Sequence, residues 1–132
     1  MVRLGRETFV LQTILVAEDE EDIRAIVANV LSKPGYRVLE AANGAEALHL
    51  LAEHEIDLLV TDVVMPDMNG FQLAQQAVAL RPKIALIYMS GFYTEAQKRS
   101  GPHGLMLTKP FRPSVLLTHV TKELGPPNSP GD

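Results

Sequence analysis

The chain has 132 residues, of which 46% are hydrophobic and 21% charged; this composition supports one compact domain with a buried core and excludes a disordered chain. The formal net charge of −4 argues against a direct nucleic-acid binder, because such proteins usually present a basic face. The lack of cysteine excludes disulfides and thiol catalysis, and the apolar runs fall short of the roughly 20 residues that span a bilayer. We therefore expect a cytoplasmic protein that makes no contact with a membrane.

The interior of the sequence alternates between strand and helix patterns. Residues 13–17 form a run typical of a strand that is buried on both faces. The apolar residues from Ile23 to Leu31 recur at helical spacing. In chain order we expect a strand over 13–17, a helix over about 22–32, a strand over 36–41, a helix over about 43–54, a strand over 56–61, a helix over 71–80, strands over 84–89 and 105–107, and a last helix over about 113–124.

The two ends and one internal stretch carry weaker patterns. Residues 1–12 are expected to form a lead-in or linker, and the Pro/Gly-rich residues 125–132 a flexible tail with nothing to bury. Within the internal stretch, residues 94–99 have the pattern of two helical turns at most. A single domain is thus predicted over residues 13–124.

Alternation of strand and helix with short connections predicts a parallel sheet with helices on both faces. In such folds ligands bind beyond the carboxyl ends of the strands, where the strand order reverses. Functional side chains should therefore follow each apolar run directly. The residues in those positions are Glu18, Asp19 and Glu20 after the first strand, Asp62 after the third, Ser90 and Gly91 after the fourth, and Thr108-Lys109-Pro110-Phe111 after the fifth.

The chemistry of these residue types is complementary. Clustered carboxylates repel one another unless a cation neutralises them, and an oxygen-only donor set favours a hard ion such as Mg²⁺. A lysine opposite the carboxylates supplies positive charge for a phosphate, and a serine hydroxyl can donate to a phosphoryl oxygen. Together these groups provide what phosphoryl transfer to a carboxylate requires.

Each residue also has an ordinary structural interpretation. The acidic residues 18–22 suit a helix N-terminus, Asp62 suits a loop cap, and Ser90 with Gly91 suits a turn. Lysines such as Lys109 are commonly solvated on a surface. The functional interpretation is favoured by their joint placement, since each falls at the carboxyl end of a strand in the chemical type that the reaction needs.

Four motifs carry a family likeness. They read Ile14-Leu15-Val16-Ala17-Glu18-Asp19-Glu20, then DLLVTDVVMPDMNG over residues 57–70, then Met89-Ser90-Gly91, and then Leu107-Thr108-Lys109-Pro110-Phe111. In this order they resemble the response-regulator receiver domains of two-component signalling, which include the chemotaxis-regulator-like proteins. The resemblance implies a flavodoxin-like (βα)5 fold, with five parallel strands in the order 2-1-3-4-5 and helices on both faces.

The resemblance also implies a function. Asp62 would accept a phosphoryl group from a phosphohistidine on a histidine kinase or a histidine phosphotransfer protein, and so switch partner interactions in a phosphorelay. Ser90 and Lys109 would contact the phosphoryl oxygens, and the Lys109–Pro110 peptide would be cis, as is typical of the family. Mg²⁺, or Mn²⁺ in its place, would be bound by Asp19, Asp62, the backbone carbonyl of Val64, and Glu18 acting through a water.

The sequence departs from the family pattern at three positions. Glu18 replaces the commoner aspartate, and its longer side chain should still reach a metal-bound water. Ser90 replaces the commoner threonine and keeps the hydroxyl. Met106 stands where the family often has tyrosine or phenylalanine, and a methionine can pack there without acting as an aromatic switch.

Other functions are weighed against this one. A phosphatase of the haloacid dehalogenase type needs a second aspartate two residues after the nucleophile, whereas Asp62 is followed by Val63-Val64. An adaptor that no longer accepts phosphate would not need Asp19, Asp62, Ser90 and Lys109 together. We expect a non-enzymatic receiver that is either a stand-alone regulator or, the alternative that we favour, a receiver excised from a hybrid histidine kinase. It would be present as a monomer or weak dimer.

Overall fold

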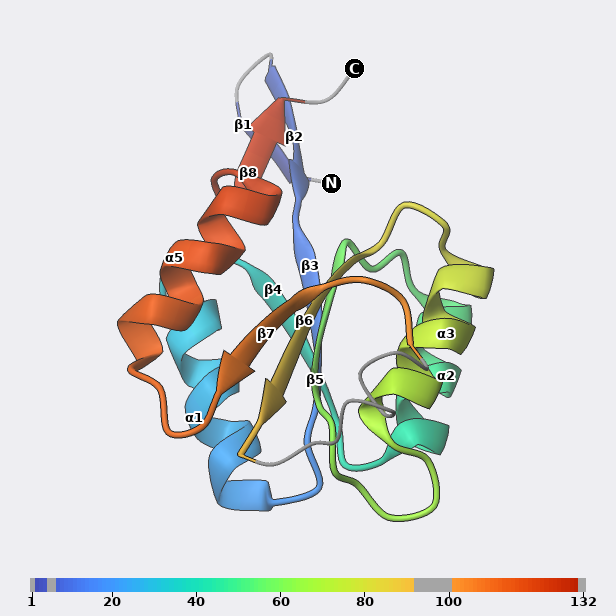
Figure 1. Cartoon of the computed structure of the whole chain (residues 1–132). Coiled ribbons are helices and arrows are strands. Elements are labelled where there is room, and N and C mark those ends of the chain that lie inside the picture. The colour runs from blue at the N-terminus through green and yellow to red at the C-terminus, as the bar shows by residue number, and fades with distance from the viewer. Residues whose placement is uncertain (1, 5–6, 92–100, 131–132) are drawn as a thin grey trace.

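The computed structural model describes residues 2–4, 7–91 and 101–130, and it consists of a layered α/β domain with a small additional sheet at one end (Figure 1). Helices flank both sides of a central sheet, while the small sheet projects beyond the end of the domain opposite the carboxyl ends of the strands. Among the described residues, no helix is long and apolar enough to cross a bilayer.

The central sheet has five parallel strands. Its order is β4-β3-β5-β6-β7, which matches the predicted order 2-1-3-4-5 once the strands are counted from residue 13. The prediction of the fold is therefore confirmed. The strands are β3 (Thr13–Ala17), β4 (Arg37–Ala41), β5 (Leu58–Asp62), β6 (Ala85–Ser90) and β7 (Leu105–Thr108).

Four described helices cover the two faces of the sheet. Helices α1 (Glu21–Ser32) and α5 (Pro113–Leu124) pack on one face, and α2 (Gly44–Glu53) and α3 (Gly70–Leu80) pack on the other. All four were predicted to within about two residues at each end. The two helical turns expected over residues 94–99 lie outside the described residues.

The helix starts are stabilised in different ways. Asn43 and Asn69 cap α2 and α3 by accepting hydrogen bonds from the backbone N–H groups of Glu46 and Gln72. Helices α1 and α5 differ, because their N-cap residues Glu20 and Arg112 make no side-chain cap hydrogen bond. Helix α5 begins with Pro113, which suits a first helical turn, whereas α1 has neither a side-chain cap nor such a proline.

The core lies between the sheet and its two helix layers. Every residue of β3 and β5 is buried, as their nearly unbroken apolar runs predicted. One cluster of core residues surrounds Phe71 and Tyr88 under α2 and α3, and the other lies under α1 and α5. The two central strands thus fix where Glu18 and Asp62, which lie at their carboxyl ends, are placed.

A second, three-stranded sheet joins the two ends of the chain. Strand β2 (Glu7–Leu11) pairs antiparallel with both β1 (Val2–Leu4) and β8 (Asn128–Pro130). Residues 128–130, which lie within the predicted Pro/Gly-rich tail, form strand β8, which the sequence did not indicate. Pro130 weakens any strand signal there, although proline is tolerated in an edge strand. The division of the chain into lead-in, domain and tail remains a prediction.

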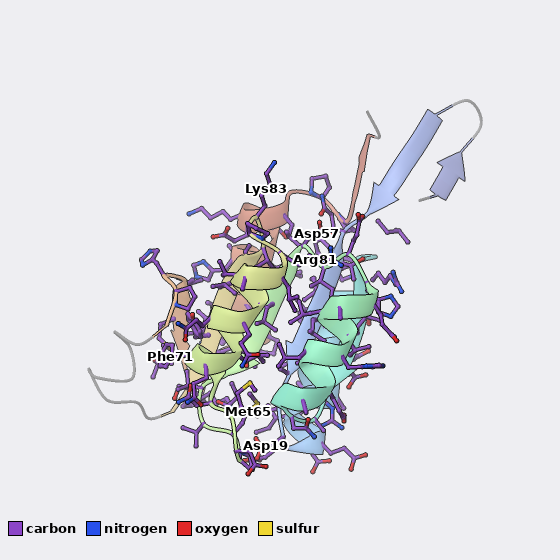
Figure 2. The ribbon with its side chains drawn as sticks, turned by 90° about the vertical axis from the view of Figure 1, so that its right-hand side faces the viewer. Asp19, Asp57, Met65, Phe71, Arg81 and Lys83 are labelled. Carbon is purple, nitrogen blue, oxygen red and sulfur yellow. The ribbon has the colours of Figure 1, made fainter. Side chains whose placement is uncertain are left out.

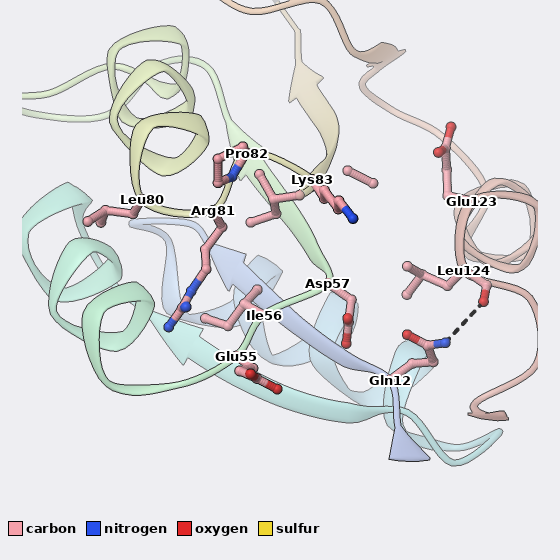
Figure 3. A pocket seen from close by; sticks show the side chains of 12 residues that line it. Gln12, Glu55, Ile56, Asp57, Leu80, Arg81, Pro82, Lys83, Glu123 and Leu124 are labelled. Carbon is pink, nitrogen blue, oxygen red and sulfur yellow. Dashed lines mark hydrogen bonds between the residues drawn. The ribbon is translucent and has the colours of Figure 1, made fainter. Parts of the chain in front are cut away.

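The two ends of the central sheet differ in chemistry. Figure 2 shows Asp19 at the end to which the strands point, and Asp57, Arg81 and Lys83 at the opposite end. A cavity of about 550 Å³ lies at that opposite end, and Arg81 and Lys83 line it together with Glu55, Asp57 and Glu123 (Figure 3). Its mixture of charges contrasts with the concentration of carboxylates around Asp19.

Candidate functional site

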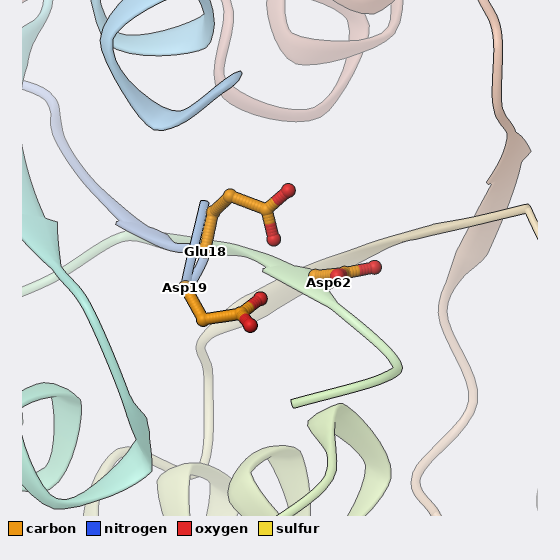
Figure 4. Close-up of side chains that lie close together, drawn as sticks. All are labelled: Glu18, Asp19 and Asp62. Carbon is orange, nitrogen blue, oxygen red and sulfur yellow. The ribbon is translucent and has the colours of Figure 1, made fainter. Parts of the chain in front are cut away.

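Three carboxylates meet where the central strands end. Glu18 and Asp19 follow β3, and Asp62 is the last residue of the neighbouring strand β5. Each offers an oxygen atom, and these atoms all lie within 4.8 Å of one another (Figure 4). The parallel register of β3 and β5 brings them together, as the positions after the strands predicted.

Lys109 reaches this cluster from the loop after β7. Its Nζ donates a hydrogen bond to Glu18 Oε1 at 2.9 Å and lies 3.5 Å from Asp62 Oδ1. The Lys109–Pro110 peptide is cis, as the family resemblance implied. The lysine and the aspartate predicted to act on a phosphoryl group therefore lie in contact with each other.

Glu18 is the most buried of the three acids, since none of its surface is exposed. Burial raises the pKa of Glu18 to about 7 from the ordinary 4.5; the hydrogen bond from Lys109 opposes this increase, and the nearby Asp62 carboxylate adds to it. Its second oxygen, Oε2, is buried and finds no hydrogen-bond partner among the described residues. Such an atom is costly unless a cation or a proton satisfies it.

Lys109 responds to the same charges. Burial acts to lower the pKa of Lys109, but the hydrogen bond to Glu18 and the negative charges of Asp62 and Glu18 outweigh it and raise the pKa above 10.5. The lysine is therefore a permanent cation at neutral pH. It stabilises negative charge on the acids, and it is placed to stabilise the negative charge of a phosphoryl group on Asp62.

Ser90 and Val64 complete the predicted site. Ser90 is buried at the end of β6, and its carbonyl accepts a hydrogen bond of 2.9 Å from the Lys109 backbone N–H, so β6 holds the lysine-bearing loop. Val64 lies two residues after Asp62, with its side chain exposed. The roles of the Ser90 hydroxyl and the Val64 carbonyl remain predictions.

Two further residues support the site and were not predicted to do so. Gly70 begins α3 so close to β5 that a side chain there would strike the Asp62 carbonyl oxygen. Arg24 of α1 donates a hydrogen bond of 2.9 Å from Nη1 to the Glu18 carbonyl. Gly70 was visible as the end of the second motif, but its close approach to the strand has no local sequence signal.

Met106 packs in the core beside Tyr88. The two residues are partners in the register of β6 and β7, and Met106 is only partly buried. The aromatic ring next to this position therefore belongs to β6 and not to β7. The Tyr88 hydroxyl donates a hydrogen bond of 2.6 Å to the Pro102 carbonyl.

The residues present fit a hard divalent cation. The cluster offers oxygen donors only, one of them a buried carboxylate oxygen without a hydrogen-bond partner among the described residues, and the Lys109 ammonium contacts two of its three acids, Glu18 and Asp62. A cation held there would neutralise the excess negative charge. Glu18, Asp19 and Asp62 are the side chains that would hold it.

Comparison with known proteins agrees with this geometry. The family model of the response regulator receiver domain matches residues 14–121. The chain is 35% identical over 117 residues to the response regulator receiver protein CpdR of Brucella abortus, covering 86% of this chain and 98% of that protein. The chain therefore belongs to the response-regulator receiver family, the receiver domains of two-component systems.

Other relatives place similar domains in different contexts. The sensor kinase CckA of Brucella abortus is 38% identical over 117 residues, which are 85% of this chain but only 12% of the kinase. The receiver domain of a hybrid histidine kinase CckA has a TM-score of 0.74 at 35% identity, covering 85% of this chain and 98% of that domain. The chemotaxis protein CheY4 of Vibrio cholerae has a TM-score of 0.80 at 28% identity, covering 87% and 100% of the two chains.

Proposed function

We propose that Asp62 accepts a phosphoryl group from a phosphohistidine in a Mg²⁺-dependent reaction, and that this modification switches partner interactions in a phosphorelay. The observation that carries the proposal is the cluster that Asp62 forms with Lys109 and two further carboxylates, Glu18 and Asp19. A lysine 3.5 Å from the acceptor and an oxygen cluster within 4.8 Å match the needs of phosphoryl transfer to a carboxylate.

In the proposed reaction an oxygen of Asp62 forms a bond to phosphorus as the bond between phosphorus and the histidine nitrogen breaks. The electron pair of the broken bond stays on the imidazole, which needs a proton to become neutral histidine. Lys109 stabilises charge on the phosphoryl oxygens and the Ser90 hydroxyl donates to one of them. Bound Mg²⁺ supplies further neutralisation of those oxygens, and Mn²⁺ is expected to replace it.

A phosphodonor protein has a suitable surface next to the site. An apolar groove of about 550 Å³ lies between α1 and the start of α5, and Lys109 lines one end of it. Ile26 on its rim is 57% exposed. A helix of a histidine kinase or phosphotransfer protein seated here would hold its phosphohistidine near Asp62.

This surface can be tested separately from the chemistry. Ile26→Asp should slow transfer from a phosphorylated histidine phosphotransfer protein but leave phosphorylation by acetyl phosphate unchanged, because the small donor needs no groove. Leu80→Asp changes a comparably exposed apolar residue on α3 and serves as the matched control. Equal rates of protein-to-protein transfer for both variants would argue against the groove.

Two other functions have less support. A phosphatase would need a second carboxylate two residues after Asp62, and the chain has Val64 there. An adaptor would not require a buried glutamate beside a paired lysine. We therefore infer a receiver that is not itself an enzyme, that acts in the cytoplasm, and that serves either alone or as part of a hybrid kinase, as the similar receiver domain of CckA does.

The decisive experiment measures phosphoryl transfer directly. The protein is incubated with acetyl phosphate and Mg²⁺, and its intact mass is followed with and without a chelator. The wild type should gain one phosphoryl group only with metal, and Asp62→Asn should gain none. Asp67→Asn is the matched control, because Asp67 is an exposed residue in the following loop whose positive φ of 66° asparagine tolerates. Phosphate on Asp62→Asn would refute the assignment.

A further inference from the structure

We propose that Arg24 is a positioning residue that holds the acidic β3–α1 loop in its metal-binding arrangement. This inference rests on the proposed Mg²⁺ function of Glu18 and Asp19. The Arg24 guanidinium donates from Nη1 to the Glu18 carbonyl at 2.9 Å, and its Nε lies 3.5 Å from Glu40 Oε1 on β4. It thereby connects the loop to the neighbouring strand.

The loop lacks the ordinary means of fixing a helix start. Helix α1 has no side-chain cap at Glu20, whereas α2 and α3 are each capped by an asparagine. The Arg24 backbone N–H bonds to the Glu20 carbonyl at 2.9 Å, and its side chain extends further back to the carbonyl of Glu18. One residue therefore secures both ends of the short segment that carries Asp19.

The backbone of Glu18 is held by hydrogen bonds at both its N–H and its carbonyl. Its N–H donates to the Ala41 carbonyl at 3.0 Å, and its own carbonyl accepts from Arg24. Glu40, the acidic partner of Arg24, directly precedes Ala41 on β4. Arg24 and β4 thus hold the Glu18 backbone from both sides and contact each other. The backbone held in this way orients the Glu18 side chain toward Asp62 and Lys109.

Charge adds a reason for this arrangement. Residues 18–22 are five consecutive acids, whose mutual repulsion tends to spread the loop apart. Arg24 is partly shielded, with 17% of its side chain exposed, so its interactions are screened less than those of a surface residue. An arginine can serve two acceptors in fixed geometry, whereas a lysine offers a single point charge.

The test measures Mg²⁺ binding by calorimetry on the folded full chain, well below its melting temperature. Arg24→Gln should weaken Mg²⁺ affinity about tenfold, the low end of what loss of an outer support costs a metal site. Arg24→Lys should recover part of the affinity, since a cation remains. Phosphorylation of Arg24→Gln by acetyl phosphate should be slower than that of the wild type at limiting Mg²⁺, and should reach the wild-type rate at saturating Mg²⁺.

Arg81 offers a matched control. Its Nη2 donates to the His54 carbonyl at 3.0 Å, the same kind of bond, at the far end of the domain (Figures 2 and 3). Arg81→Gln should change Mg²⁺ affinity less than twofold, even where it lowers the melting temperature. Equal weakening by both substitutions would show general destabilisation and overturn the proposal.

The remaining outcomes separate this inference from the proposed function. If the wild-type protein binds Mg²⁺ and Arg24→Gln binds it with the same affinity, only the role of Arg24 is overturned, and the proposed function stands. Failure of the wild-type protein to bind Mg²⁺ would overturn the proposed function and the role of Arg24 with it. If Arg24→Gln does not fold, Arg24→Lys decides the question. Weaker Mg²⁺ binding in Arg24→Lys, with phosphorylation that recovers at high Mg²⁺, supports the positioning role of Arg24, and Mg²⁺ affinity equal to that of the wild type rejects it.

Discussion

Lys109 lies closer to Glu18 than to Asp62: its ammonium is 2.9 Å from the glutamate oxygen and 3.5 Å from the aspartate oxygen. In this arrangement the buried glutamate is the main partner of the lysine. A phosphoryl group on Asp62 would bring new acceptor oxygens that compete for the same ammonium. The contact with Glu18 is therefore an interaction that phosphorylation is expected to weaken.

The first prediction concerns the pH dependence of stability without metal. The pKa of Glu18 is raised from 4.5 to about 7 in the folded protein, so between these values the folded state binds more protons than the unfolded state. The free energy of unfolding should therefore fall as pH rises from 4.5 to 7, with little further contribution from Glu18 above that range. A shift of this size corresponds to about 3 kcal/mol.

The measurement is urea denaturation in the presence of a chelator at several pH values, with Glu18→Gln as the diagnostic variant. Glutamine keeps the shape of the side chain and removes its titration, so the variant should lose the decline and be more stable than wild type near pH 8. Glu20→Gln removes a neighbouring exposed carboxylate and should keep the decline. A decline that persists in Glu18→Gln would assign it to another group.

The second prediction concerns the increase in melting temperature that Mg²⁺ produces. A cation at the cluster displaces the proton of Glu18, so its binding becomes weaker as pH falls below about 7. The Mg²⁺-induced increase should therefore be larger at pH 8 than at pH 6, and chelation should abolish it. Asp19→Asn should reduce the increase at both pH values, while its metal-free protein should be no less stable than wild type because repulsion between the acids is relieved.

The burial of Glu18 shows what sequence reasoning could not reach. Strand ends and residue types were sufficient to bring Asp19, Asp62 and Lys109 to one edge of the sheet, because the fold rule alone sends those ends there. Which of the neighbouring acids turns inward depends on Lys109, 91 residues away along the chain. No local pattern separates a buried glutamate from an exposed one in a run of five acids.

The small terminal sheet was missed for a related reason. Its strands pair residues near the two ends of the chain, such as Phe9 with Pro130, and the C-terminal partner is rich in proline and glycine. Such a segment has low strand propensity, and only a partner from another part of the chain makes it extended. The central strands, by contrast, are predicted by apolar runs in the sequence, whatever segments they pair with.

The third prediction concerns Gly70. A methyl group there would meet the Asp62 carbonyl oxygen, and also the Asp62 carbonyl carbon and Val63 Cα at 3.0 Å, all of them backbone atoms that cannot move independently. Gly70→Ala should lower the free energy of unfolding by about 3 kcal/mol, despite the better helix propensity of alanine. It should also slow phosphorylation, because the displaced backbone carries the acceptor.

Gly91→Ala is the control for this substitution. Gly91 also lies beside the site, but its added methyl would find only Lys109 Cβ at 3.9 Å, an ordinary contact. Denaturation curves should show Gly91→Ala within about 1 kcal/mol of wild type. Similar losses for the two variants would mean that the close approach of α3 to β5 is not what makes Gly70 necessary.

The fourth prediction concerns Tyr88, whose ring contacts Phe71 at a centroid distance of 4.7 Å and whose hydroxyl bonds to the Pro102 carbonyl. Tyr88→Phe keeps the ring and removes the hydroxyl, so it should cost about 1 kcal/mol. Because β6 continues from Tyr88 to Ser90, this bond ties the segment before β7 to the strand that carries the site hydroxyl. Amide hydrogen exchange should therefore become faster at His103 and Gly104.

Tyr36→Phe is the control for this substitution. It removes a comparable hydrogen bond to the Gly125 carbonyl and should leave exchange at His103 and Gly104 unchanged. A similar increase in exchange in both variants would contradict the role of Tyr88.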